Sequence, residues 1–222
     1  MRFVPFLAAA VLAAPLAAQA THAADPDKKA DGSAGLPAGW SYRLESPTAA
    51  IADVKFVTMG ATGLHFTSGP PGIYWRAADA VTGGFHTVAT FTQTKAPAHP
   101  EAYGLFVAGK DLTGAGASYI YLIVRGDGQY SVRQGGAAGA PSTNLTAGAR
   151  NGWMPNDAVA KQDSAGKATN KLEIQSDGKT LKFSVNGKQV HEMAAPAGGG
   201  IVGIRMNHNL DVHVDGFAVH KL

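Results

Sequence analysis

The sequence predicts an all-β fold in which two antiparallel sheets pack face to face as a sandwich. Short apolar or alternating runs recur from Trp40 to the C-terminus, and glycine-rich turns separate them. No window after the N-terminal segment keeps a 3.6-residue period over three turns, and the 28 glycines suit many turns between short strands. About a dozen strands with hairpin turns and no long helix predict two packed sheets or a barrel.

The first 20 residues predict a secretory signal peptide. Arg2 precedes a short alanine- and leucine-rich run that ends in small residues at Ala20. A membrane anchor is the alternative, but this run is too short to cross a bilayer comfortably and no later run is longer. Residues 21–38 predict a flexible leader. We therefore expect a single secreted or periplasmic domain over residues 39–222, with no membrane span.

The expected strands follow the leader in close succession. They cover residues 40–45, 53–59, 63–67, 73–76, 85–94, 103–108, 118–124, 129–134, 172–174, 181–185, 188–193, 201–206 and 210–219. Residues 77–81 are the one short helical candidate. Two turns predict hairpins: one around Gly60, and one at Asn186-Gly187, where both residues tolerate a positive φ.

Two further segments have distinctive compositions. Residues 119–124 are apolar at every position, which predicts a central strand covered on both faces. Residues 135–168 are rich in Gly, Ala, Ser, Asn and Asp and hold one aromatic residue, Trp153. Such a long loop inside a domain is often functional.

Composition excludes several classes of function. The chain has no cysteine, so disulfides, thiolate metal sites and a cysteine nucleophile are excluded. The formal net charge of +3 is small and no Lys/Arg cluster occurs, so we expect no nucleic-acid partner. A serine nucleophile elbow, G-x-S-x-G, is absent as well.

The last fifty residues carry the most specific pattern. A strand at 181–185 runs into Asn186-Gly187-Lys188; the strand Gly200-Ile201-Val202-Gly203-Ile204-Arg205 follows, and a closing strand ends at Asp215-Gly216-Phe217. This ending resembles the final strands of concanavalin-A-like domains of the laminin-G and 3-keto-disaccharide hydrolase kinds, closest in style to the latter. The resemblance implies an antiparallel jelly-roll sandwich. Arg205 and Gly216 stand where the hydrolase type often has Gln and Asn.

Catalytic carboxylates are scarce. Laminarinase-like members of the superfamily that the chain resembles carry three acids on one strand, spaced E-x-D-x-x-E. This chain has only four glutamates, Glu45, Glu101, Glu173 and Glu192, and none begins such a strand. The sequence therefore favours a domain that binds without catalysis.

One strand could hold a metal ion. Asp211, His213 and Asp215 alternate on the closing strand, so their side chains share one face. They are candidate metal ligands, or an acid/base pair, and by resemblance to other jelly rolls calcium is the candidate ion. The alternative is an ordinary solvent-facing strand.

Sugar recognition needs aromatic faces for the rings and polar side chains for the hydroxyls. Residues that combine these properties at strand ends or in loops are the candidate ligand contacts: Tyr74, Arg76, His86, Trp153, Arg205, Asn207 and His208. Tyr130 and Arg133, on the hairpin after the central strand, are further candidates. The leading hypothesis is an exported domain that binds carbohydrate or a small glycoside.

Two other functions stay open from sequence. A sugar-active hydrolase or lyase of the 3-keto-disaccharide hydrolase kind predicts that Asp211, His213 or Asp215 lines a pocket together with Arg205. A structural or protein-interaction module predicts a broad apolar patch in place of a polar pocket.

Overall fold

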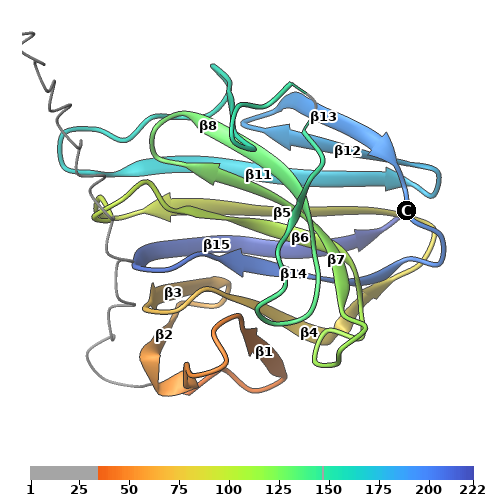
Figure 1. The fold of residues 1–222 in the computed structure, drawn as a ribbon, viewed down its shortest axis with the longest axis horizontal. Helices are drawn as coiled ribbons and strands as arrows, with labels where there is room; N and C mark the ends of the chain where they lie inside the picture. The colour runs from red at the N-terminus through yellow and green to blue at the C-terminus, as the bar shows by residue number, and fades with distance from the viewer. Residues whose placement is uncertain (1–34, 147) are drawn as a thin grey trace, which may run out of the picture.

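The computed structural model describes residues 35–146 and 148–222, which form two antiparallel sheets packed face to face (Figure 1). The predicted signal peptide, residues 1–20, and the leader up to residue 34 lie outside the described residues. Within the described ranges no helix is long and apolar enough to cross a membrane. The predicted all-β jelly-roll sandwich is confirmed.

One sheet, here called sheet A, carries the site described below. Its strands, in spatial order, are β1 (Trp40–Leu44), β4 (Gly72–Val81), β14 (Gly200–Met206), β6 (Ala102–Lys110), β7 (Ser118–Arg125), β8 (Gln129–Gly135) and β10 (Met154–Pro155), and β9 (Thr143–Asn144) also pairs with β8. β14 returns from the C-terminal part of the chain to lie between β4 and β6.

The second sheet, sheet B, lies behind sheet A in the view of Figure 1. Its strands, in spatial order, are β13 (Lys188–Ala194), β12 (Thr180–Val185), β11 (Ala168–Asp177), β5 (Gly84–Gln93), β15 (Leu210–Lys221), β3 (Gly63–Ser68) and β2 (Val54–Met59). A 3-10 turn, η1 (Ile51–Asp53), leads into β2.

Turn chemistry explains the predicted hairpins. β2 and β3 pair through a turn in which Gly60 has φ +61°. β12 and β13 pair across Asn186 and Gly187, whose φ angles are +50° and +78°. Both residues of that turn therefore have the positive φ that a type I′ turn requires.

The helical candidate at 77–81 is wrong, because these residues continue β4. Ala80 and Val81 pair with Ile201 and Gly200 of β14, so backbone pairing with a distant strand decides their conformation. Val81 is buried beside two exposed neighbours, which is a strand pattern. The sequence of residues 77–81 alone cannot show that they pair with β14.

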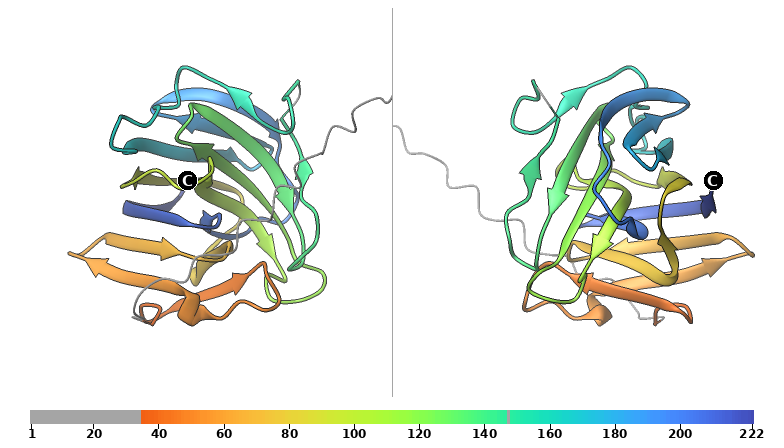
Figure 2. Two further views of the ribbon diagram at one scale, coloured as in Figure 1. Left: turned by 60° about the vertical axis from the view of Figure 1, so that its left-hand side comes forward. Right: turned by 90° about the vertical axis from the view of Figure 1, so that its right-hand side faces the viewer.

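The main core lies between the sheets, and a second apolar cluster covers the outer face of sheet A. In β7, Ile120, Leu122 and Val124 belong to the main core, while Tyr119, Tyr121 and Ile123 belong to the second cluster. β7 is therefore covered on both faces, as its composition predicts. The segment between β8 and β11 crosses the outer face of sheet A (Figures 1 and 2), which brings Trp153 to this cluster.

Candidate functional site

A pocket of about 330 Å³ opens on the outer face of sheet A, beside the crossing segment. That volume is within the range of small-ligand sites. Its lining combines charged groups, amide and imidazole groups, and aromatic rings: Arg125, Arg133, Arg205, Glu45, Glu101, Asn207, His208, Tyr119, Tyr121 and Trp153. We call it the sheet A pocket.

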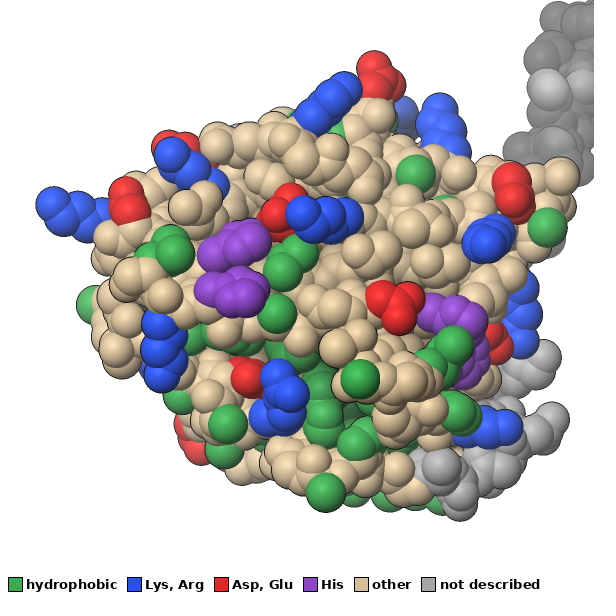
Figure 3. All heavy atoms as spheres, turned by 180° about the vertical axis from the view of Figure 1, so that it is seen from behind, with side chains coloured by type: hydrophobic (Ala, Val, Ile, Leu, Met, Phe, Trp, Pro, Cys, Tyr) green, Lys and Arg blue, Asp and Glu red, His purple; other side chains and the backbone are tan. Residues whose placement is uncertain are grey.

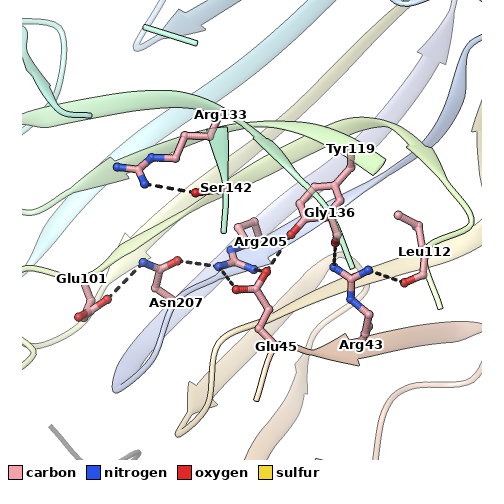
Figure 4. Close-up of polar contacts among 10 residues, drawn as sticks. All are labelled: Arg43, Glu45, Glu101, Leu112, Tyr119, Arg133, Gly136, Ser142, Arg205 and Asn207. Carbon is pink, nitrogen blue, oxygen red and sulfur yellow. Dashed lines mark hydrogen bonds and ion pairs between the residues drawn. The ribbon is translucent and has the colours of Figure 1, made fainter. Parts of the chain in front are cut away.

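An arginine–glutamate pair is part of its lining, and Figure 4 shows the contacts of this pair. Arg205 on β14 forms an ion pair with Glu45, which directly follows β1, and one guanidinium nitrogen donates to Glu45 Oε2 at 2.8 Å. The hydroxyl of Tyr119 on β7 donates to Glu45 Oε1, also at 2.8 Å. The Arg205 guanidinium carbon lies 5.4 Å from the ring centroid of Tyr121. Three strands distant in sequence thus fix one charged pair.

This environment keeps Glu45 ionised. Burial alone would raise the pKa of Glu45, but the charge of Arg205 and the hydrogen bonds from Arg205 and Tyr119 outweigh it, so the pKa lies below its usual value. Burial raises the pKa of Tyr119, and its hydroxyl remains a donor. Arg205 stays charged, because the attraction of Glu45 outweighs the cost of burial and raises the pKa of Arg205.

A second polar cluster lies at the end of β14. Asn207 accepts a hydrogen bond from Arg205 at 3.3 Å through its side-chain oxygen and donates to Glu101 Oε2 at 3.3 Å. His208 Nε2 lies 2.8 Å from Glu101 Oε1. The side chains of Glu45, Arg205, Asn207 and Glu101 therefore form one connected network along the pocket (Figure 4), and His208 joins it through Glu101.

Trp153 packs against two arginines, Arg125 at the end of β7 and Arg133 on β8. The guanidinium carbons of Arg125 and Arg133 lie 4.1 Å and 5.3 Å from its ring centroid. Such stacking is attractive, because the ring face is electron-rich. Trp153 is half-buried, so part of its ring stays accessible beside the pocket.

A side chain of β1 supports one wall of the pocket. Arg43 donates to the backbone oxygens of Leu112 at 2.8 Å and Gly136 at 2.7 Å, which fixes the start of the crossing segment. Gly135 must lack a side chain, because a Cβ there would lie 2.2 Å from the ring of Tyr119. The ring of Tyr119 therefore lies directly over the last residue of β8, where the crossing segment begins.

The structure brings four of the seven predicted ligand contacts together. Trp153, Arg205, Asn207 and His208 all line the sheet A pocket. They come from the long loop and from the end of β14, as predicted. Of the two further candidates, Arg133 also lines the pocket, whereas Tyr130 is buried between the sheets.

The other three lie elsewhere. Tyr74 is fully buried between the sheets against Phe56, and its ring does not reach the pocket. Arg76 forms an ion pair with Asp79 at 2.7 Å. His86 lies on sheet B, 3.2 Å from the carboxylate of Glu173.

The predicted metal ligands also lie on sheet B, on the face shown in Figure 3, where histidine side chains gather in two places. His213 packs edge-on against His65, at 4.6 Å between centroids, and Lys95 lies 2.9 Å from the carboxylate of Asp211. Among the described residues no group of three or more His, Asp or Glu side chains is placed to hold a metal ion. Asp211, His213 and Asp215 are therefore not gathered into such a group, and the carboxylate of Asp211 contacts Lys95 and His65 instead.

The same placement overturns one form of the enzyme hypothesis. That form required Arg205 and an acid or histidine of β15 to line one pocket. Arg205 belongs to sheet A and Asp211, His213 and Asp215 to sheet B, and none of these three lines the pocket of Arg205.

Five charged or aromatic lining residues were not predicted from the sequence: Glu45, Glu101, Tyr119, Tyr121 and Arg125. The odd positions of β7 offered one usable signal, since Tyr119, Tyr121 and Arg125 share one face of a strand. The glutamates gave none, because Glu45 meets Arg205 across 160 residues of sequence.

No protein-family model and no curated protein matches this chain. Solved structures do match, at low sequence identity. The carbohydrate-binding module CBM66 from Bacillus subtilis has a TM-score of 0.57 and 11% identity, over 82% of this chain and 96% of that one.

Two further structures match with a TM-score of 0.50. The exoplasmic/lumenal domain of VIP36, in a Ca²⁺/Man3GlcNAc-bound form, has 10% identity over 85% of both chains. An alginate lyase, A1-II′, has 11% identity over 83% of this chain and 95% of that one. These likenesses establish the fold alone: like these three structures, the chain is a two-sheet jelly-roll sandwich.

Proposed function

We propose that the chain binds a carbohydrate in the sheet A pocket and does not act on it chemically. The observation that carries the proposal is the pocket itself, in which charged, amide and imidazole side chains surround aromatic rings. Sugars present hydroxyls to such polar groups and apolar ring faces to aromatic side chains. Two structures of similar fold bear on the proposal: one is a carbohydrate-binding module and another is an oligosaccharide-bound form.

The network is preorganised for binding. Arg205, Glu45 and Tyr119 are held by one another, so a ligand meets side chains whose positions are already fixed. Side chains that are fixed before binding lose little conformational entropy when a ligand arrives. Trp153, half-buried on the crossing segment, adds an aromatic surface at the side of the pocket.

The two pocket glutamates favour binding over catalysis. Cleavage of a glycosidic bond commonly uses one carboxylic acid whose pKa is raised so that it can donate a proton. Glu45 has the opposite character, because Arg205 and Tyr119 hold its pKa below the usual value. Glu101 is engaged by Asn207 and His208.

Calorimetric titration with a broad panel of neutral and acidic oligosaccharides tests the proposal. We expect at least one ligand to bind, and we expect Trp153→Ala and Asn207→Ala each to weaken it about tenfold or more, as loss of an aromatic or polar contact does. His86→Ala serves as the control, because His86 lies on the opposite sheet. This substitution should change the affinity by less than about twofold.

Two results would overturn the proposal. The first is a panel in which no oligosaccharide binds at millimolar concentration. The second is binding that survives Trp153→Ala and Asn207→Ala but is lost in His86→Ala, since the ligand would then occupy sheet B. Release of reducing ends or of unsaturated sugars from a bound oligosaccharide would contradict the non-catalytic part.

A further inference from the structure

We propose that the carbohydrate carries a carboxylate, and that Arg133 is the residue that receives it. This inference rests on the proposed function, because it names the class of sugar that the sheet A pocket takes. It depends on a difference among the three arginines that line the pocket.

Two of these arginines already have a carboxylate partner. Arg205 pairs with Glu45. Arg125 pairs with Asp127, at 2.6 Å between a guanidinium nitrogen and Oδ2, with a second contact of 3.2 Å from Nε to Oδ1. Their charges are therefore balanced within the protein.

Arg133 has no carboxylate partner among the described residues. Its Nε donates to Ser131 at 2.9 Å, and its two terminal nitrogens have only long contacts, to Ser142 at 3.4 Å and to the backbone oxygen of Gly152 at 3.5 Å. A guanidinium has five N–H donors, so these neutral acceptors leave two donors unused and the positive charge unbalanced. Over the described part of the chain, Arg133 is thus the pocket arginine whose charge no carboxylate balances.

The surroundings hold that guanidinium in place. It stacks against Trp153, and the pocket end of β8 faces the crossing segment at Ser142. Figure 4 shows Arg133 on the β8 side and Glu45 on the β1 side, with Arg205 between them. A carboxylate bound at Arg133 would therefore have Arg205 between it and the charge of Glu45.

The chemistry of the group fits a carboxylate. The planar fork of a guanidinium matches the two oxygens of a carboxylate, and a fixed fork gains specificity from two parallel hydrogen bonds. In a partly buried pocket this attraction is screened less than on an open surface. A saccharide with uronic acid residues presents such a carboxylate next to an apolar ring face, which suits Arg133 beside Trp153.

The test compares matched sugars that differ only in charge. The probes are oligosaccharides of galacturonate, glucuronate, mannuronate and guluronate, each beside its carboxyl-reduced neutral counterpart, titrated into the full chain by calorimetry. We expect at least one uronate to bind about tenfold or more tightly than its neutral counterpart, and this preference to shrink as salt is raised.

Variants assign the preference to one residue. Arg133→Gln should bring the affinity for the uronate down to that for its neutral counterpart, while Arg133→Lys should keep part of the preference, because lysine retains the charge but not the fork. Arg150→Gln is the matched control, since Arg150 is an exposed arginine on the same crossing segment. It should leave the preference intact.

The outcomes separate the two proposals. Equal affinity for charged and neutral forms overturns the uronate inference and leaves carbohydrate binding standing. A preference that persists in Arg133→Gln, or that Arg150→Gln abolishes, overturns the role of Arg133. Absence of binding to every probe overturns both. If Arg133→Gln fails to fold, the wild-type comparison of charged and neutral sugars, with Arg133→Lys, still decides.

Discussion

Arg205 carries a buried charge on the outer face of sheet A. Its side chain is only 6% exposed, and its charge is balanced by Glu45, a residue with a side chain 28% exposed. A buried charge without its partner is costly, because neither water nor a counter-charge then stabilises it. The pair therefore links the stability of the sheet to the shape of the pocket.

Replacing Glu45 by Gln tests this link. Glu45→Gln keeps the size of the side chain and removes the charge opposite Arg205, so we expect the free energy of unfolding at pH 7 to fall by about 2–3 kcal/mol. Urea denaturation followed by circular dichroism measures it. Glu192→Gln, at an exposed position of β13, is the control and should change stability by less than about 0.5 kcal/mol.

The same variant has a predictable pH dependence. Because the folded pKa of Glu45 lies below its ordinary value of 4.5, the charged carboxylate stabilises the folded chain above about pH 4.5. That contribution is lost as the pH falls through the lowered folded pKa. The stability difference between the wild type and Glu45→Gln should therefore shrink on acidification. A difference that stays constant from pH 7 to pH 3 contradicts this account of the pair.

At the scale of elements, the β12–β13 turn does more than reverse the chain. The side chain of Asn186 accepts from the backbone N–H of Lys171 at 2.8 Å, and donates to the backbone oxygen of Ala158 at 2.8 Å and to Asn170 Oδ1 at 2.9 Å. It thus ties the hairpin to β11 and to the segment that leads away from Trp153.

Two substitutions separate the conformation of this turn from its hydrogen bonds. Asn186→Gly removes the bonds but suits the positive φ, and we expect a loss of about 2 kcal/mol in the free energy of unfolding. Asn186→Ala also strains the backbone and should cost about 1 kcal/mol more. Thermal and urea denaturation measure both. If Asn186→Gly is as stable as the wild type, the three bonds are unimportant.

Elements were the most predictable level from sequence. Alternation and turn residues are local, so the hairpin at Asn186-Gly187 and the doubly covered strand over residues 119–124 could be located without a structure. The C-terminal half of β4 could not, because its strand conformation depends on pairing with β14, far along the chain. The signal peptide over residues 1–20 stays a prediction.

At the scale of the whole molecule, one core joins the two sheets and predicts cooperative unfolding. The main core takes side chains from both sheets, so neither sheet can keep its packing when the other is lost. We expect far-UV circular dichroism and fluorescence of Trp40, Trp75 and Trp153 to report the same urea midpoint. A tryptophan transition well before the loss of strand signal would show that the outer face of sheet A unfolds separately.

The pocket is formed by strands from across the whole molecule, so only part of its lining can be predicted from the sequence. Trp153, Asn207 and His208 could be selected because polar or aromatic residues in loops and at strand ends often contact ligands. Glu45 and Glu101 could not, because they come near Arg205 and Asn207 only through the order in which strands pair across sheet A. The type of each residue can be read directly from the sequence, whereas the order of the strands in the sheet decides which residues meet in the pocket.

The double burial of β7 constrains how the specificity of this protein could diverge. Its alternate side chains fill two separate apolar layers, so a change of Tyr119 or Tyr121 made for a new ligand also disturbs packing that the fold requires. Ser142 of the crossing segment is different, because it is exposed at the rim of the pocket and does not pack in either apolar layer. Diversification among descendants of this chain should therefore accumulate in the loop, while the strand beneath it stays nearly invariant.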